Sequence, residues 1–252
     1  KDGIKILDNI NFSIKGGQIL GIAGVDGNGQ NELANIILAL DKHSKGDIFL
    51  LDENLNDKNV RERRKFGLGL IPEDRMTFGI ASNMTIEENL LSDKIDAEKF
   101  NKKFVLNKKE IDKYADEQIK EYRIKANNSN EKVGMLSGGN IQKVVVAREL
   151  SSDPQIIIAN QPTRGIDIGA KKFVWSKLLE LREKGKAVLL ISADLNEILE
   201  LCDSVMVMKN GRIVAYFDDS KNLSEYELGL YMLGVKEQEL GENLWKKIRQ
   251  VN

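Results

Sequence analysis

The residues with the clearest potential for chemistry form a glycine-rich loop near the start of the chain. Gly24, Gly27 and Gly29 occupy the first, fourth and sixth positions of the segment GVDGNG, which follows the apolar run at 18–23. Glycines let successive backbone N–H groups converge on an anion, and the N-terminus of a following helix adds partial positive charge. This order of strand, loop and helix predicts a phosphate cradle.

The same loop departs from the phosphate-binding pattern G-x-x-x-x-G-K-[ST] at its two most reactive positions. Gln30 stands in place of the lysine, and Asn31 stands in place of the hydroxyl that binds Mg²⁺. A GxGxxG interpretation also fails, because its third glycine would fall on Glu32. By itself the loop fits either a phosphate site or a plain glycine-rich turn. The candidate nucleotide-binding residues are Gly24, Val25, Asp26, Gly27, Asn28, Gly29, Gln30, Asn31 and Glu32.

Four further segments carry polar residues at the ends of predicted strands or at the start of a helix. They are 71–75 (IPEDR), 136–143 (LSGGNIQK), 160–167 (NQPTRGID) and 188–194 (VLLISAD). The Ser137-Gly138-Gly139 turn opens a predicted helix. Four consecutive apolar residues at 156–159 predict a parallel strand that is covered on both faces.

Strands that alternate with helices predict an α/β fold with a parallel or mixed sheet. Strands are expected at 4–14, 18–23, 46–51, 68–71, 156–159, 188–192, 205–209 and 212–217. Asn210-Gly211 between the last two predicts a two-residue hairpin turn. Helices are expected at about 108–122, 140–150, 170–184 and 195–201.

Two of the helices are predicted from buried positions at helical spacing. For the helix after the glycine loop these are Leu33, Ile36, Ile37 and Leu40. For the helix at 108–122 they are Ile111, Tyr114, Ile119 and Tyr122. The polar stretch from 82 onward indicates a helical subdomain with soft boundaries. After Gly234 the chain becomes charged, with Trp245 and Ile248 on a short helix.

The composition excludes several classes of protein. The chain has 252 residues, 41% hydrophobic and 31% charged, and a formal net charge of −1, which gives no overall attraction to nucleic acid or anionic lipid. The single cysteine, Cys202, excludes a CxxC site and is predicted to be buried. No apolar stretch approaches the roughly 18 residues of a membrane helix, and no signal peptide begins the chain. The basic run Arg61, Arg63, Arg64 and Lys65 is interpreted as a solvated face.

Together, in this order and spacing, the five segments resemble the motifs of ABC-type ATPases over residues from about 4 to 217. The resemblance identifies them as phosphate loop, Q-loop, signature, Walker B with D-loop, and switch strand. It implies a P-loop NTPase core with a mixed or parallel sheet, an N-terminal antiparallel β subdomain, and a helical subdomain at about 82–150 that carries the signature. The domain would span 1–235, with a C-terminal tail at 236–252.

The exact residues of the motifs narrow the resemblance to one group within this family. GVDGNGQNEL, IPEDR, LSGGNIQK, NQPTRGID and ELGLYMLG look like the second, C-terminal ATPase half of tandem importers for simple sugars and nucleosides. VDGNGQ and the missing Walker B acids look more like the nucleoside importers. The chain begins at Lys1 without an initiator Met, which fits the second half of a longer polypeptide.

The resemblance implies that five positions have lost the hydrolytic groups of the family. These degenerate catalytic positions are Gln30, Asn31, Asn160, Gln161 and Ala193, where Lys, Ser or Thr, Asp, Glu and His are usual. Losing one charge-assisted phosphate contact costs about 1.5–3 kcal/mol, and an amide cannot act as a general base near neutral pH. We therefore expect no hydrolysis and no metal ligands at this site, and weak or absent ATP binding.

The signature turn is intact. By resemblance, Ser137, Gly138 and Gly139 act in trans and complete the ATP and Mg²⁺ site of the partner half. Asp167 and Arg164 would face that half. Arg164 could equally be a solvent-exposed side chain.

Glu73 takes the Q-loop position and would lie at the groove for a membrane permease, although a salt-bridged surface turn is the alternative. The expected partners are an N-terminal ATPase half of the same polypeptide, permease subunits and, indirectly, an extracytoplasmic binding protein, with no nucleic acid. This places the protein at the cytoplasmic face of the cell membrane.

Three alternatives stay open. A soluble twin-ATPase would share the signature but normally keeps its Walker Lys and catalytic Glu. A structural or regulatory domain would bind no nucleotide. Gln161 could also be an engineered replacement of Glu, although one such change would not explain five.

Overall fold

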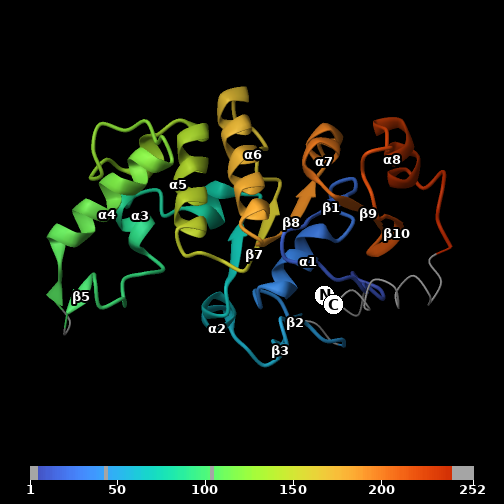
Figure 1. Cartoon of the computed structure of the whole chain (residues 1–252), viewed down its shortest axis with the longest axis horizontal. Helices are drawn as coiled ribbons and strands as arrows, with labels where there is room; N and C mark the ends of the chain where they lie inside the picture. The colour runs from blue at the N-terminus through green and yellow to red at the C-terminus, as the bar shows by residue number, and fades with distance from the viewer. Residues whose placement is uncertain (1–4, 43–44, 103–104, 240–252) are drawn as a thin grey trace. The chain divides into compact units, whose positions relative to one another are not determined.

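The central strands of the first compact unit pair into a mixed sheet, which Figure 1 shows in a computed structural model. The structure describes residues 5–42, 45–102 and 105–239. Within these residues the sheet has six strands in the order β10-β9-β1-β8-β7-β4. Their bounds are β1 Ile19–Ala23, β4 Leu68–Ile71, β7 Ile156–Asn160, β8 Ala187–Ser192, β9 Ser204–Lys209 and β10 Arg212–Phe217.

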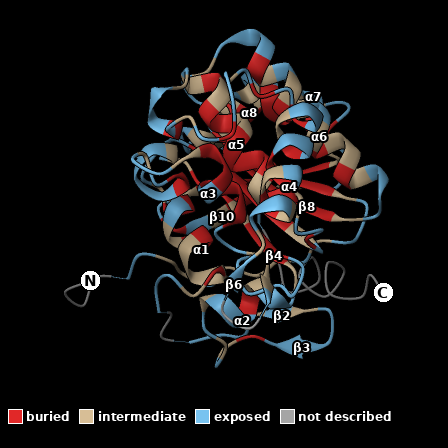
Figure 2. Cartoon of the chain, turned by 90° about the vertical axis from the view of Figure 1, so that its left-hand side faces the viewer, coloured by how far each residue is buried: buried red, intermediate tan, exposed pale blue. Residues whose placement is uncertain are grey.

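The parallel part of the sheet explains why its sequence is so apolar. β1 pairs in parallel with both β8 and β9, and β7 pairs in parallel with β8. All residues of β1 and β8 are buried, as expected for strands covered on both faces, and the buried residues gather in the sheet in Figure 2. Ala23 lies opposite Ser192, and Asn160 lies opposite Ile191. The carboxyl ends of three neighbouring strands therefore meet at one edge, where ligands bind in open α/β sheets.

At the other side of the sheet, β9 and β10 form the predicted antiparallel hairpin. Asn210 and Gly211 have φ values of 47° and 72°, the left-handed conformation that a two-residue type I′ turn requires. The prediction from the Asn-Gly pair is confirmed. A second antiparallel pair is formed by β2 (Phe49–Leu50) and β3 (Glu53–Asn54).

Helices complete the first unit, which comprises residues 1–70, 154–161 and 177–252. α1 contacts β7, α7 contacts β1 and β8, and α8 contacts β9. Their bounds, with that of α2, are α1 Gln30–Ile37, α2 Val60–Lys65, α7 Leu195–Leu201 and α8 Glu225–Met232.

The second compact unit comprises residues 71–153 and 162–176 and is mainly helical. α3 packs against α4 and α5. Ile111, Tyr114 and Tyr122 are buried as predicted, and Ile119 is half-buried. The bounds are η1 Arg75–Gly79, α3 Ile86–Leu91, β5 Asn101–Lys102, β6 Val105–Leu106, α4 Lys108–Glu121, η2 Val133–Met135 and α5 Gly138–Leu150. α6 runs from Ile168 to Glu183, and its residues up to Ser176 belong to this unit.

The strand prediction for residues 4–14 is wrong for the part that is described. Residues 5–18 belong to no strand. The alternating apolar residues do pack on the core of the first unit, Leu7 and Phe12 among them, and the Asp8 N–H donates to the Gly211 carbonyl at 2.8 Å. The alternating apolar residues of this segment thus mark side chains that pack on the core, and they do not mark a strand that is hydrogen-bonded to a neighbour.

Two further expectations are corrected. Leu40 is 52% exposed, because α1 ends at Ile37 and Leu38 is the buried residue of its C-cap. Arg63 is only 2% exposed, so the basic run is not uniformly a solvated face. The predicted helix with Trp245 and Ile248 lies outside the described residues.

Candidate functional site

The glycine loop lies between β1 and α1, as predicted. Gly27 and Gly29 have φ values of 88° and 102°, which only glycine adopts readily. A Cβ atom on Gly29 would also lie 2.7 Å from Leu7 Cδ2. Conformation and space therefore both require glycine here. The result is a bent backbone followed directly by a helix N-terminus, the geometry expected from the sequence for a phosphate-binding loop.

Gln30 occupies the place of the phosphate-binding lysine, and its side chain folds back over the loop. Its Nε2 donates to the Val25 carbonyl at 3.1 Å, and the residue is 7% exposed. A neutral amide thus satisfies a carbonyl of the loop itself. It supplies no positive charge to an incoming phosphate.

Asn31 and Asn160 replace the hydroxyl and carboxylate that hold Mg²⁺ in this motif. Asn160 Nδ2 donates to Asn31 Oδ1. Asn160 is 5% exposed, and its Oδ1 accepts no hydrogen bond from the described residues. Two amides bonded to each other offer no negative charge to offset a divalent cation, so the pair is a poor site for Mg²⁺.

Gln161 connects the loop to the switch strand. Its Nε2 donates to Asp26 Oδ1 at 3.2 Å, and its Oε1 accepts from the Ala193 N–H at 3.2 Å. Its own N–H donates to the Ile191 carbonyl at 2.8 Å, and its φ is 49°. The first unit therefore brings the substituted positions together at one edge of the sheet, where uncharged amide side chains form hydrogen bonds near Asp26.

The sequence did not reveal that the hairpin turn is tied to the glycine loop. Asn28 Oδ1 accepts from the Asn210 N–H at 2.8 Å, and the Asn28 carbonyl accepts from the Gly211 N–H at 2.9 Å. The Asn-Gly turn was recognised, but nothing in its spacing indicated this partner. The turn holds the middle of the loop in place.

In the second unit, the signature turn opens α5 as predicted. Gly139 is buried, and a Cβ atom there would lie 2.7 Å from Asp167 Oδ2 and 2.8 Å from Ala170 Cβ. Asp167 Oδ1 accepts from the Ala170 N–H at 2.9 Å, and this hydrogen bond lowers the pKa of the Asp167 carboxyl. Gly139 is thus needed so that Asp167 can lie against the first turn of α5.

Glu73 and Arg164 form an ion pair within the second unit. Beside it, Arg75 Nη1 donates to the Arg164 carbonyl at 2.7 Å and Nη2 donates to the Gly165 carbonyl at 3.1 Å. The salt-bridged turn considered for Glu73 is therefore present. The role of Arg75 as a link between 71–75 and 160–167 was not foreseen from the sequence.

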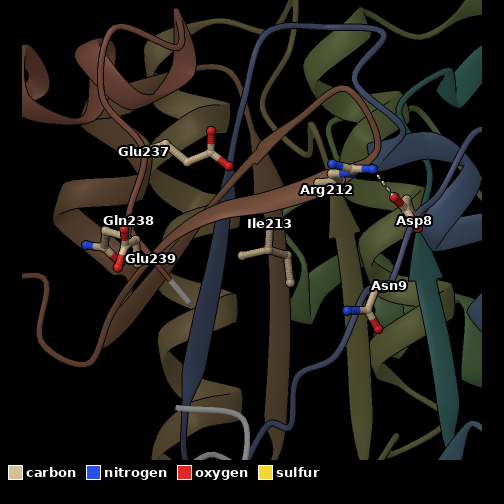
Figure 3. Close-up of a pocket in the computed structure, with 7 residues that line it drawn as sticks. All are labelled: Asp8, Asn9, Arg212, Ile213, Glu237, Gln238 and Glu239. Atoms are coloured by element: carbon tan, nitrogen blue, oxygen red, sulfur yellow. Dashed lines mark ion pairs between the residues drawn. The ribbon is translucent and has the colours of Figure 1, made fainter. Parts of the chain in front are cut away.

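A cavity of about 500 Å³ lies beside β10 (Figure 3). Arg212 in its wall forms an ion pair with Asp8. The other charged side chains of the wall are Glu237 and Glu239. Carboxylates outnumber the cation, so this cavity does not suit a phosphate.

The described residues contain no cluster of three or more potential metal-ligating side chains. Across the same part of the chain, every helix is too short or too polar to cross a membrane.

A family model described as ABC transporter matches residues 7–164 of the chain. The chain belongs to the ABC transporter family. The resemblance inferred from the five motifs is confirmed.

Relatives within the ABC transporter family are import proteins by name. The guanosine import ATP-binding protein NupO of Bacillus subtilis (strain 168) is 40% identical over 240 residues, 95% of this chain and 47% of NupO. The nucleoside import ATP-binding protein NupA of Lactococcus lactis subsp. cremoris (strain MG1363) is 34% identical over 225 residues, 89% of this chain and 44% of NupA. The chain thus spans about half the length of these relatives.

Solved ABC cassettes share the fold. The dimeric bacterial cassette MJ0796 matches with a TM-score of 0.74 and 27% identity, over 87% of this chain and 93% of that one. The α/β P-loop fold with a mixed sheet, expected from the motifs, is confirmed.

Proposed function

We propose that the chain is a nucleotide-binding cassette of the ATP-binding subunit of an importer for nucleosides or simple sugars. Similarity to NupO and NupA, whose names refer to guanosine and nucleoside import, supports nucleosides as the first substrate class to test. Ribose and xylose import proteins are also 37–39% identical to this chain over more than 200 residues, which keeps simple sugars in the proposal.

The cassette's own site is proposed to be non-hydrolytic. The observation that carries this part is the neutral network of the first unit. Gln30 bonds its own loop, Asn31 bonds Asn160, and Gln161 bonds Asp26 and Ala193. Phosphoryl transfer depends on positioned charge, and these five positions supply none. Any ATP bound here would be held weakly and with little need for Mg²⁺.

The signature turn is proposed to act in trans on a second cassette. Ser137, Gly138 and Gly139 would complete the ATP and Mg²⁺ site of an N-terminal half of the same polypeptide, with Asp167 and Arg164 at the interface. The half-length match to NupO and NupA is compatible with a tandem arrangement. In this proposal the cassette covers 1–235, its signature-bearing helical part covers 82–150, and 236–252 is a tail.

Membrane contact is proposed to go through permease subunits near Glu73, at the cytoplasmic face of the cell membrane. An extracytoplasmic binding protein would deliver the substrate to the permease. No role for nucleic acid is proposed.

The test uses two substitutions in the full-length protein that contains this chain. Ser137→Arg places a long side chain at the exposed start of α5, where a partner's nucleotide would approach, and is expected to abolish ATPase activity. Gln161→Ala removes only the hydrogen bonds of an uncharged side chain in the non-hydrolytic site and is expected to leave the rate within about threefold of wild type. Steady-state phosphate release measures both.

If the two substitutions lower the ATPase rate equally, the proposal that this cassette's own site is non-hydrolytic while its signature turn acts in trans is rejected. Tm values of both variants, measured alongside, separate loss of activity from loss of fold.

A further inference from the structure

The side chain of Asn140 lies between the signature serine and a backbone amide of the segment that precedes the signature. Asn140 Nδ2 donates to Ser137 Oγ at 2.9 Å, and Asn140 Oδ1 accepts from the Lys125 N–H at 2.9 Å. All three residues belong to the second unit. Asn140 is half-buried, and Ser137 is exposed.

The Lys125 N–H fixes the orientation of the Asn140 amide. A backbone N–H can only donate, so the atom that faces it must be Oδ1, and Nδ2 must then face Ser137. Since Nδ2 can only donate, Ser137 Oγ is the acceptor. The single hydroxyl hydrogen of Ser137 is therefore not directed at Asn140 and can be donated to another acceptor.

Helix capping does not use this hydroxyl. Within the described residues, Ser137 forms no side-chain capping bond to α5. The Ser137 carbonyl begins the helix by accepting from the Ile141 N–H at 2.9 Å. The Ser137 hydroxyl is exposed, accepts from Asn140 and does not cap the helix. It is therefore suited to donate to an anion at the N-terminus of α5.

We propose that Asn140 is a positioning residue that orients the Ser137 hydroxyl as a hydrogen-bond donor to the terminal phosphate of nucleotide held by the partner cassette. This inference rests on the trans role proposed for the signature turn. Asn140 does not touch the phosphate in this scheme. It acts by occupying the acceptor side of Ser137 Oγ, with the Lys125 backbone as its anchor.

The replacement Asn140→Asp separates orientation from folding. A carboxylate still accepts from the Lys125 N–H, and a negative charge near a helix N-terminus is favourable. It cannot donate to Ser137, however, so the Ser137 hydroxyl turns to donate to the carboxylate and loses its outward hydrogen.

The experiment compares steady-state ATPase rates and Tm values of the full-length protein. Asn140→Asp is expected to lower kcat about tenfold to hundredfold, the loss of one hydrogen bond to a charged group, while Tm is unchanged or raised. Asn130→Asp is the matched control, since exposed Asn130 adds the same charge in the same unit, and it is expected to retain the wild-type rate. If Asn140→Asp fails to fold, Asn140→Ala takes its place, with an expected loss of about threefold to tenfold because the hydroxyl is released without being reversed.

A double-mutant cycle separates the orientation of the Ser137 hydroxyl from direct repulsion between the new carboxylate and the phosphate. On a Ser137→Ala background there is no hydroxyl to orient, so Asn140→Asp, or its replacement Asn140→Ala, should lower kcat less than threefold further. A full additional loss on that background would overturn the inference.

The arms also distinguish the two levels of the proposal. A wild-type rate for Ser137→Ala would reject the trans role of the signature turn itself. A slow Ser137→Ala protein together with a wild-type rate for both Asn140 variants would reject only the positioning role.

Discussion

At the residue scale, Gln161 shows how the neutral site is held together. Its side chain accepts a hydrogen bond from Ala193 and donates one to Asp26. These two bonds require both the carbonyl oxygen and the NH₂ group of an amide. The carboxylate usual at this position in the family could accept from Ala193, but it would face Asp26 with the same charge. The amide is therefore the side chain that suits Asp26 in the loop.

Gln161→Glu should therefore lower the free energy of unfolding by an amount that depends on pH. Two unit charges about 4 Å apart repel by about 1 kcal/mol in water, so the variant should unfold more easily than wild type at pH 7. The Asp26 charge raises the folded-state pKa of the new carboxyl, so the difference from wild type grows as pH rises through that pKa and disappears near pH 4. Chemical denaturation at several pH values measures it.

Gln161→Ala is the control for that series. It loses both side-chain hydrogen bonds without adding charge, so its difference from wild type should not vary with pH. A Gln161→Glu protein as stable as wild type at pH 7 would mean that Asp26 does not oppose a carboxylate.

At the element scale, Arg63 of α2 caps the end of α1. Its Nη1 donates to the Ile36 and Ile37 carbonyls at 2.8 and 2.7 Å, and its Nε donates to the Lys58 carbonyl at 3.0 Å. The last carbonyls of a helix have no partner within the helix, and a cation there is favoured by the helix dipole. Burial lowers the pKa of Arg63, but a guanidinium remains charged in proteins. The helix after the glycine loop is thus anchored at its far end by a buried cation.

Arg63→Met should therefore destabilise the protein by about 2–4 kcal/mol, because the last carbonyls of α1 lose a charged donor. At about 2–4 °C per kcal/mol for a chain of this size, Tm should fall by several degrees. Lys65→Met, an exposed position on the same helix, should change Tm by less than about 1 °C. Similar Tm values for the two variants would contradict the capping role.

The same elements show what the sequence could and could not predict. Local chemistry determined the Asn210-Gly211 turn and the buried β7 and β8, and these predictions are confirmed. Arg63 is buried because it bonds carbonyls of α1 that are 26 and 27 residues away in the sequence, which local pattern does not reveal. The alternation of apolar residues at 4–14 could not distinguish side chains packed on the core from a strand paired in a sheet. At the site, the family resemblance predicted that the five substituted positions belong together, and the structure brings them to one edge of the sheet. The pairing of Asn31 with Asn160 depends on tertiary distance, which spacing does not encode.

At the scale of the whole molecule, the two sets of residues for which a role is proposed belong to different units. The five substituted positions all lie in the first unit. The signature turn, Glu73, Arg164 and Asp167 all lie in the second. Loss of charge is therefore confined to the unit that would hold this cassette's own nucleotide, as expected if only the surface offered to a partner is needed for hydrolysis.

Nucleotide should consequently stabilise this cassette only slightly. A ligand that binds the folded state adds RT ln(1 + [L]/Kd) to its stability. For a Kd on the order of 1 mM, ATP at about 5 mM adds about 1 kcal/mol, or roughly 2–4 °C in Tm. A Kd of about 10 µM would add about 3.7 kcal/mol under the same conditions.

The rise in Tm on adding ATP should stay at or below about 4 °C and should be the same with Mg²⁺ or EDTA, because Asn31 and Asn160 offer the metal no charge. Sulfate at equal ionic strength controls for general salt effects, and a large shift that requires Mg²⁺ would show that the amide network forms a working metal and nucleotide site.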